Sequence, residues 1–451
     1  MTRIAVIGGG LAGLSASRAL QQRGIHTVLF EAGSRLGGRA LTDELDGLRI
    51  DPCAQLFGSM YENFLALVRD VGLGEQLVRV PGRDALWRDG RAHEVVYGSV
   101  ASMATSGGLP LFTRLRLGGM YAPFLARHAH DLSISAPEKA AVAGLDNESI
   151  AAWGEREIDE AFVSALVYPQ LGAYYAASPD DTSAGFYHIL ARYGMDVTLY
   201  AVNGGVGSVA ERIGSRILEA GGELRLSSPV REVTLTDGTP HQPGPVAIRT
   251  DAGEETFDGV IAALPAPLLP PMLRGAPEGL QRWLAEVRYH PAVALVLTLD
   301  TPTSGRFFGL SFPRGTTRYV SAVAVQEHKG IPLSDRNRGA LVVFSTPEVA
   351  GTLVGMESRE VLDLMLPEVA SAFPGIEKRV TRARVYRWPE GAPVMYPGYL
   401  ARVGGFRKDS PEGDSSIVLA GDYLYGPSVE GAVLSGLAAA DRLTSRLRIH
   451  G

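Results

Sequence analysis

Hydrophobic positions near the two ends of the chain alternate between short apolar runs and helical patterns. The apolar run from Ile4 to Ile7 leads into glycines and then into leucines and alanines spaced for one helix face. A second apolar run, from Thr27 to Phe30, ends in Glu31. Near the C-terminus, the segment 416–443 again has the pattern of a buried strand, a loop and a long helix. This order predicts an α/β region in which strands precede helices.

Three inner stretches share this α/β character. The spacing of apolar residues from Tyr61 to Val71 predicts a helix. In 203–233 a glycine-rich turn opens an amphipathic helix, Gly221-Gly222 stops it, and a strand follows. The run from Asp258 to Pro265 predicts a further strand, which the proline ends.

The segments 81–199 and 266–399 have a different pattern, with a helical layer in the first and mostly strands in the second. The predicted elements are a hairpin around Asp89-Gly90, helices within 109–125 and 147–171, strands at Ala292–Leu299 and Ala340–Phe344, and a helix at Arg359–Phe373. We therefore expect a second unit of the α+β class, with a mixed or antiparallel sheet.

Length and composition favour a folded protein of more than one unit. The chain has 451 residues, of which 45% are hydrophobic, so it can bury a sizeable core. Its net charge of −6 argues against a nucleic-acid partner, which normally meets a basic excess. The single cysteine, Cys53, rules out an intramolecular disulfide, and no histidine spacing indicates a metal site. With the first strand starting at residue 4 and no long apolar run, we expect a cytoplasmic protein.

The glycines after the first strand fit the G-x-G-x-x-G pattern at Gly8, Gly10 and Gly13. In a dinucleotide-binding βαβ unit, the first allows a tight turn and the second lets the backbone approach a pyrophosphate. The third lets the helix pack close to the strand, and the helix N-terminus then faces the phosphates. Glu31 can accept hydrogen bonds from ribose hydroxyls. A purely structural glycine turn is the weaker interpretation, because strand, helix and acid all stand at the expected places.

The residues after the acid carry a family resemblance. Arg35-Leu36-Gly37-Gly38-Arg39 follows Glu31 after a short gap. Acid followed by R-x-G-G-R resembles the FAD-binding start of the flavin amine oxidase superfamily, which includes monoamine and polyamine oxidases, protoporphyrinogen oxidases and carotenoid desaturases. The segment from Ala420-Gly421-Asp422 to Glu430-Gly431-Ala432 resembles the C-terminal flavin motif of the same superfamily.

The resemblance implies a Rossmann-type FAD-binding domain assembled from 1–80, 200–265 and 400–451, with 81–199 and 266–399 forming the substrate-binding domain. It implies that FAD is bound without a covalent link. The implied contacts include Val230, whose backbone would meet the adenine, and Asp422, which would help to hold the ribityl–phosphate section. The full set of implied cofactor-binding residues is Gly8, Gly10, Leu11, Ala12, Gly13, Glu31, Ala32, Gly37, Gly38, Arg39, Val230, Gly421, Asp422, Glu430, Gly431 and Ala432.

Three residues are candidates for the catalytic site on the same grounds. The segment after R-x-G-G-R passes under the flavin ring in the resembling families, which makes Gln55 a candidate for lining it. Cys53 stands where those families have a small residue, and we interpret it as a buried apolar side chain. Trp388 lies in a stretch that resembles the W-x-x-x-A-x-P pattern of protoporphyrinogen oxidases and desaturases. Tyr423, one position after Asp422, would lie close to the ring.

Two observations bear on the substrate in opposite ways. Amine oxidases of this superfamily usually carry a lysine near the flavin, and the corresponding stretch, HPAVALVLTLD, has none. Lys329 follows a later strand, and we expect it to be solvated. Tyr423 and Trp388, in contrast, could form the aromatic pair that amine oxidases often place beside the flavin.

The region 109–193 offers two further alternatives. The Leu-, Gly- and Arg-rich stretch from Leu109 to Leu125 is expected to be a buried helical layer, and a shallow membrane-contact surface is the alternative. The tyrosines between Tyr168 and Tyr193 either wall a substrate cavity or pack in the core. We expect His188, within this cluster, to be structural.

The first functional hypothesis is an FAD-dependent oxidase or dehydrogenase of a hydrophobic small molecule, similar to protoporphyrinogen oxidases or desaturases. Hydride would pass to flavin N5, and oxygen or another acceptor would reoxidise the flavin. The alternative is a soluble flavin amine oxidase that produces an imine and hydrogen peroxide. A binding protein similar to the Rab GDP-dissociation inhibitors is least favoured, because the flavin motifs are all present.

Overall fold

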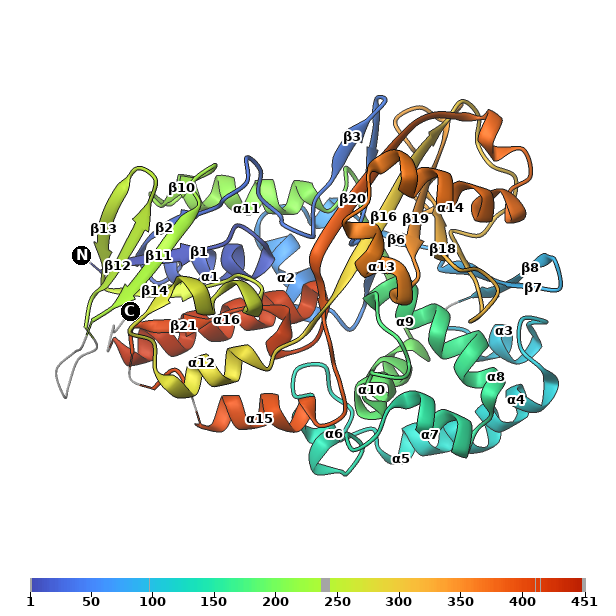
Figure 1. The fold of residues 1–451 in the computed structure, drawn as a ribbon, viewed down its shortest axis with the longest axis horizontal. Helices are drawn as coiled ribbons and strands as arrows, with labels where there is room; N and C mark the ends of the chain where they lie inside the picture. The colour runs from blue at the N-terminus through green and yellow to red at the C-terminus, as the bar shows by residue number, and fades with distance from the viewer. Residues whose placement is uncertain (1, 97, 237–243, 410, 414, 448–451) are drawn as a thin grey trace.

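The computed structural model describes residues 2–96, 98–236, 244–409, 411–413 and 415–447. Two sheet-containing parts lie side by side in it, with a helical layer below the second (Figure 1). A parallel five-stranded sheet forms the first part, in the order β10-β2-β1-β14-β21. Its strands are β1 Arg3–Ile7, β2 His26–Phe30, β10 Glu223–Arg225, β14 Gly259–Ala262 and β21 Ile417–Leu419.

The apolar strands of this sheet are buried on both faces, which explains why their sequences are continuous apolar runs. Ile4 and Val6 belong to a core cluster shared with the helices α1 (Leu11–Gln21), α11 (Gly207–Glu219) and α16 (Val429–Arg446). Ala5 and Ile7 point to the opposite face and join the cluster of a second sheet. Alternate residues of one strand therefore pack against two different layers, because successive side chains of a strand point to opposite faces of the sheet.

The second sheet of this part has the order β13-β12-β11-β15. Its strands are β11 Val230–Leu235, β12 Val246–Thr250, β13 Gly253–Phe257 and β15 Leu273–Arg274. β15 pairs with β11 in parallel, and Trp283 of the next helix, α12 (Glu278–Ala285), packs on Phe406 and Tyr423. Residues 266–285, placed by the sequence in the substrate unit, thus contact the first part here. Because this first part carries the predicted dinucleotide-binding turn after β1, it is called the nucleotide-binding part below.

The second part is built on a mixed seven-stranded sheet in the order β20-β16-β19-β18-β17-β7-β8. Its pairs are antiparallel except for β17 with β7. The strands are β7 Arg83–Arg88, β8 Arg91–Val96, β16 Tyr289–Leu299, β17 Gly309–Ser311, β18 Val320–Val325, β19 Gly339–Ser345 and β20 Val380–Pro393. Helix α14 (Ser358–Ala372) covers one face with Val361, Met365 and Val369. The predicted hairpin, both strands and the helix are confirmed here.

The helical layer below this sheet runs through residues 100–194. It contains α4 Leu111–Arg116, a π-helical turn at Leu117–Tyr121, α5 Ala122–Arg127, α7 Ile150–Glu157, α9 Tyr168–Tyr175 and α10 Ala184–Gly194. Contrary to the expected buried layer, four of its apolar side chains face outward: Leu111, Phe112, Leu115 and Met120 are 50–64% exposed. Within the described part of the chain, none of the helices combines the length and apolar character needed to cross a membrane.

A small three-stranded sheet, β5-β9-β6, lies at the junction of the two parts. Its strands are β5 Phe57–Gly58, β6 Leu77–Val80 and β9 Leu199–Val202. The chain leaves the nucleotide-binding part through β6 and returns through β9. These two connecting strands pair with each other in antiparallel orientation. Residues 51–58 run along this junction, which places them beside both parts.

Candidate active site

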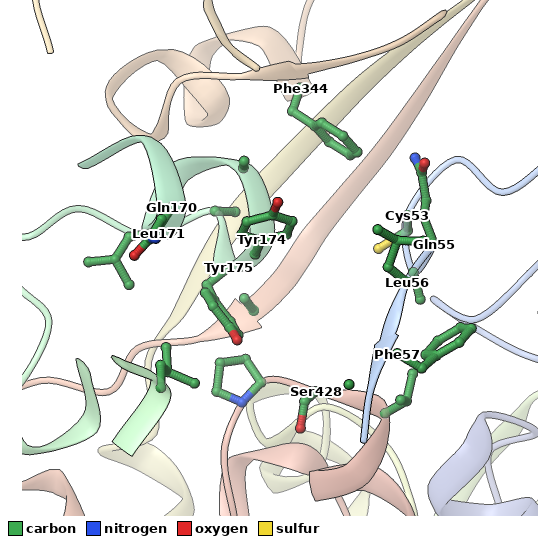
Figure 2. Close-up of a pocket in the computed structure, with 18 of the residues that line it drawn as sticks. Cys53, Gln55, Leu56, Phe57, Gln170, Leu171, Tyr174, Tyr175, Phe344 and Ser428 are labelled. Carbon is green, nitrogen blue, oxygen red and sulfur yellow. The ribbon is translucent and has the colours of Figure 1, made fainter. Parts of the chain in front are cut away.

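One cavity of about 780 Å³ lies between the two parts, and both contribute to its walls. At one end it is lined by the glycine turns that follow the parallel strands. At the other end it is lined by helix α9, the seven-stranded sheet and a bulged stretch of β20 (Figure 2). A ligand that fills it would therefore contact a nucleotide-binding end and a second, side-chain-lined end.

The nucleotide-binding end lies at the carboxyl ends of the parallel strands, where open α/β sheets bind ligands. Residues that line it follow β1, β2, β14 and β21 directly. From the set predicted to bind the cofactor, those on the wall are Gly8, Gly10, Leu11, Ala12, Glu31, Gly37, Gly38, Arg39, Gly421, Asp422 and Ala432. The N-terminus of α1 opens onto the same space, so its free N–H groups can face an anion.

The three glycines of the first turn differ in the space around them. A Cβ on Gly8 would lie 2.5 Å from the carbonyl oxygen of Ala263, and one on Gly13 would lie 2.0 Å from that of Gly8. Gly8 also has a backbone φ of +107°, which residues other than glycine rarely adopt. A Cβ on Gly10, in contrast, meets nothing within 4 Å. Gly8 and Gly13 are therefore needed for packing, while Gly10 keeps the cavity open.

The Glu31 carboxylate is held in place by backbone donors. The N–H of Gly9 donates to Oε2 and the N–H of Gly33 donates to Oε1, both at 2.7 Å. These bonds orient the carboxylate at the cavity wall, where its remaining lone pairs can accept from a ligand. Ala32 and Val230 do not line the cavity, although Ser228, two residues before Val230, donates its backbone N–H to the Glu31 carbonyl oxygen.

Arg39 and Asp422 form an ion pair across the cavity wall. Two guanidinium nitrogens of Arg39 approach the two carboxylate oxygens of Asp422 at 2.8 and 2.9 Å, a bidentate arrangement. Arg39 also donates to the carbonyl oxygen of Gly391 at 2.8 Å. Burial alone would lower the pKa of Arg39, but the Asp422 carboxylate raises it, so the guanidinium stays charged. The pair ties the first and last segments of the chain together.

Glu430 does not line the cavity and instead stabilises the start of a neighbouring helix. Its buried carboxylate accepts hydrogen bonds from the backbone N–H groups of Asn63 and Phe64 and from the Asn63 side chain. These bonds satisfy the first turn of helix α2 (Glu62–Asp70). Gly431 is also off the wall, and a Cβ there would lie 2.2 Å from the Gly426 carbonyl oxygen.

The prediction that Tyr423 lies at the catalytic centre is wrong. Its side chain is fully buried and does not line the cavity. The short 3₁₀ turn Asp422–Leu424 folds the ring back against Gly421 and onto Trp283, 6.0 Å away between ring centroids. Burial raises the pKa of this phenol far above its ordinary value, as expected for a core tyrosine. Trp388 and Gln55, the other two candidates, do line the cavity.

Aromatic and amide side chains form the second end of the cavity. Tyr174, Tyr175 and Gln170, from α9, face the segment 53–57 across the open space, with Phe344 at the sheet side (Figure 2). Tyr187 also lines the wall and donates its hydroxyl to Gln170 Oε1 at 2.7 Å. The tyrosine cluster therefore does line a cavity in part, while His188 packs in the core and bonds the Tyr121 hydroxyl at 2.9 Å.

Asp84 is a cavity residue that sequence reasoning missed. It lies on β7, is 6% exposed, and accepts from the Tyr174 hydroxyl at 2.7 Å and from the Gly309 backbone at 2.9 Å. The only signal in the sequence was an aspartate at the start of an apolar strand, which is common at strand ends. Its place at the cavity depends on the pairing of β7 with β17, which the sequence does not reveal.

The expectation that Lys329 is solvated is also wrong. It is 7% exposed, and its Nζ donates to Asp51 Oδ2 at 2.7 Å. Lys329 does not line the cavity. Where β16 reaches the cavity, it contributes Ala292 and Val293, so this wall carries no amino group from that strand. Cys53 lines the cavity, and burial raises the pKa of its thiol to about 11, which keeps it neutral.

Comparisons with known proteins agree with this geometry. The family model described as flavin containing amine oxidoreductase matches residues 11–444. Protoporphyrinogen oxidase 2 of Arabidopsis thaliana is 22% identical and covers 99% of this chain and 94% of its own length. Coproporphyrinogen III oxidase of Mycobacterium leprae is 26% identical over 98% of both chains.

Solved structures show the same fold. Cyclohexylamine oxidase from Brevibacterium oxydans superposes with a TM-score of 0.75, at 18% identity, over 99% of this chain and 100% of its own. The family-model match spans both the nucleotide-binding part and the side-chain-lined end of the cavity. The chain therefore belongs to the flavin-containing amine oxidoreductase family and is an FAD-dependent oxidase or dehydrogenase.

Proposed function

We propose that this enzyme dehydrogenates a hydrophobic small molecule, in the manner of the protoporphyrinogen oxidases or carotenoid desaturases. The observation that carries this proposal is the second end of the cavity, which is walled mainly by aromatic and aliphatic side chains. Ala292 and Val293 stand where β16 meets it, and among the described residues that line it there is no lysine. A substrate held there needs apolar contact and few polar anchors, as ligand cavities of this kind usually offer.

The residues at the nucleotide-binding end fit non-covalent FAD. The space beside Gly10 is open, the Glu31 carboxylate is preset by two backbone donors, and the N-terminus of α1 faces the cavity. Arg39 and Asp422 neutralise each other at the wall. Bound FAD supplies the hydride acceptor for the reaction. We further propose that oxygen or another electron acceptor reoxidises the reduced flavin.

The chain's own side chains bind and orient the substrate in this proposal. Tyr174, Tyr175 and Trp388 give flat apolar contact with polar atoms at one edge, which suits a conjugated or polycyclic substrate. Gln170 is held by Tyr187 and can donate through its amide nitrogen. Closure of this end around an apolar molecule would exclude water from the reacting carbon.

One observation favours the alternative, a flavin amine oxidase that yields an imine and hydrogen peroxide. Asp84 brings a carboxylate to the cavity wall next to Tyr174. An acid among aromatic side chains is suited to a substrate ammonium group. Arg114, Arg387 and Glu390 also line the cavity, but most of the remaining wall residues are apolar, which supports the first proposal more strongly.

An anaerobic titration followed by visible absorbance separates the two. Purified FAD-loaded protein is mixed with primary and secondary amines, a porphyrinogen and a polyene precursor in turn. Bleaching of the flavin by the porphyrinogen or the polyene alone supports the first proposal. Bleaching by an amine overturns it in favour of the alternative, and Asp84→Asn should then abolish that response.

We also propose that the outer face of the helical layer contacts a membrane surface. Leu111, Phe112 and Leu115 of α4 are 61–64% exposed, and Met120 is half exposed. Arg116, on the same helix, adds positive charge beside them, and Leu117 and Gly118 of the next turn line the cavity. An apolar substrate could thus pass from a lipid surface to the cavity along one short segment.

Sedimentation with anionic vesicles tests this surface. The parent protein should sediment with the vesicles, and the triple variant Leu111→Ser, Phe112→Ser, Leu115→Ser should stay in the supernatant. A matched control is Leu218→Ser, which removes an exposed leucine on α11 of the nucleotide-binding part. Equal sedimentation of parent and triple variant would contradict the proposal.

A further inference from the structure

Gln55 carries a buried donor without an acceptor in the described part of the protein. Its side chain is 6% exposed and lines the cavity, and its Nε2 makes no hydrogen bond with any described residue. A buried amide N–H₂ group normally finds a partner, because leaving it unpaired costs the free energy of removing it from water. An unpaired donor on a ligand-binding wall indicates that the ligand completes it.

The neighbouring Gln326 fixes which atom of Gln55 faces the cavity. Gln326 Nε2 donates to Gln55 Oε1 at 2.9 Å and to the carbonyl oxygen of Ala324 at 3.3 Å. A backbone carbonyl can only accept, so the Gln326 atom between these partners must be nitrogen. The Gln55 atom that meets it must then be oxygen. The Gln55 Nε2 donor is therefore not used by Gln326 and is available at the cavity wall.

A second contact holds the same two segments together. Lys329, three residues after Gln326, donates to Asp51, four residues before Gln55, at 2.7 Å. Asp51 also accepts from the Thr42 hydroxyl at 2.6 Å and from the Val206 backbone at 3.1 Å. The turn that contains Gln326 is therefore attached at two points to the segment that lines the cavity. Gln326 itself lies behind this wall and does not line it.

The position of Gln55 along the cavity points to the ring of the cofactor. Cys53, two residues earlier, lies close enough to Arg39 and Asp422 for their charges to act on the pKa of its thiol. Phe344 and Tyr174 lie across the open space from the Gln55 side chain (Figure 2). Gln55 thus stands where the nucleotide-binding end meets the substrate end.

We propose that Gln326 orients the Gln55 amide so that its Nε2 donates a hydrogen bond to an acceptor atom of the bound flavin ring. Gln55 is the residue that touches the cofactor, and Gln326 is a positioning residue. Because the ring gains negative charge on reduction, a donor at this place stabilises the reduced form more than the oxidised form. The inference rests on FAD binding alone and is independent of the substrate class proposed above.

The test is the two-electron reduction potential of the FAD-loaded protein, measured by equilibration with reference dyes, without any substrate. Gln55→Leu should shift the reduced-to-oxidised equilibrium about tenfold toward oxidised flavin, about 30 mV. Gln55→Glu keeps the shape and the bond from Gln326 but replaces the donor by a charged acceptor, so its shift should be larger. Gln326→Leu should shift the potential in the same direction and less than Gln55→Leu.

A double variant and a control complete the design. In the Gln55→Leu background, Gln326→Leu should add no further shift, because Gln326 acts through Gln55. Gln21→Leu removes a glutamine at the end of α1 that donates to the Ile217 carbonyl oxygen of α11. Gln21 does not line the cavity, so this variant should leave the potential unchanged. Parent-like potentials in both Gln55 variants would overturn the proposal. An undiminished effect of Gln326→Leu in the double variant would overturn the positioning by Gln326. Neither outcome depends on which molecule the enzyme oxidises.

Discussion

The two ends of the cavity are built in different ways. At the nucleotide-binding end, much of the wall is backbone exposed at glycines, and each stretch of wall comes from a few consecutive residues after a parallel strand. At the substrate end, the wall is mainly side chains, which come from β7, α9, β19 and β20. The first end depends on local geometry, and the second depends on how distant elements meet.

This difference decides what a substitution can do at each end. A side chain added at a glycine that packs against other backbone disrupts the fold. A side chain added at a glycine beside the open cavity occupies the place of the ligand. A side-chain wall can exchange residues while the fold persists, because the elements behind it carry the packing. We therefore expect large, all-or-none effects at the first end and graded effects at the second.

The largest contrast is expected between two glycines of the same turn. Gly13→Val should prevent stable folding, because its Cβ would overlap the Gly8 carbonyl oxygen, at a cost of at least about 3 kcal/mol. Gly10→Val should fold normally, since its φ of −74° suits any residue and its Cβ meets open space. Its side chain would nevertheless occupy the ligand's place, so FAD affinity should fall more than about 100-fold.

Thermal unfolding and the ratio of visible to ultraviolet absorbance check both variants. Gly10→Val should give a melting temperature near that of the parent apoprotein and a colourless preparation. Full flavin content in Gly10→Val would contradict the assignment of this end to the dinucleotide.

The same difference explains how far the sequence could predict the site. Gly8, Gly10, Glu31 and Arg39 lie on the wall as expected, because their positions follow from a motif of neighbouring residues. Tyr423 was placed by its distance from Asp422, and the turn that follows Asp422 sends its ring into the core instead. Spacing along the chain predicts the backbone path well, but it does not fix the direction of a side chain in an irregular turn.

At the substrate end, sequence reasoning had no comparable guide. Lys329 looked like a solvated residue because its partner, Asp51, lies 278 positions away along the chain. Asp84 and Gln326 were missed for the same reason, since each acquires its neighbours only when non-consecutive strands pair. The hairpin, the strands within β16 and β19 and the helix α14 were predicted, whereas β17, β18 and β20 were not. Their arrangement in one sheet could not be predicted either.

The next largest effect is expected where the two regions are joined. Lys329→Met would leave the Asp51 carboxylate buried without its cation, which costs about 3–5 kcal/mol of unfolding free energy. Lys378→Met, at an exposed position, is the matched control and should change stability by less than about 0.5 kcal/mol. Urea unfolding measures both. A loss no greater than that of the control would show that the pair does not hold the junction.

A graded effect with pH is expected from the core behind the substrate end. Burial lowers the pKa of His188 to about 3, whereas the unfolded chain takes up this proton near pH 6.5. The unfolded state therefore binds more protons below pH 6.5, and stability falls as the pH falls. From pH 7 to pH 5 this histidine should cost about 2 kcal/mol.

His188→Gln isolates this contribution, because a glutamine keeps a polar partner for the Tyr121 hydroxyl and does not titrate. Urea unfolding at pH 7 and pH 5 should show a drop that is about 2 kcal/mol smaller in the variant than in the parent. Equal drops in the two proteins would mean that His188 takes up its proton in the folded state.

The smallest effect is expected from two tyrosines, Tyr174 on the cavity wall and Tyr423 in the core. Tyr174→Phe removes a hydroxyl at the cavity wall that bonds Asp84, so the KM for the substrate that bleaches the flavin should rise about fivefold, or about 1 kcal/mol. FAD content should stay unchanged, because Tyr174 lies at the other end of the cavity. Tyr423→Phe removes a hydroxyl whose only close partner among the described residues is the Ala420 carbonyl oxygen at 3.5 Å, and it should alter neither KM nor FAD content. If Tyr423→Phe changed KM and Tyr174→Phe did not, the substrate end would have to be reassigned to the core side of Asp422.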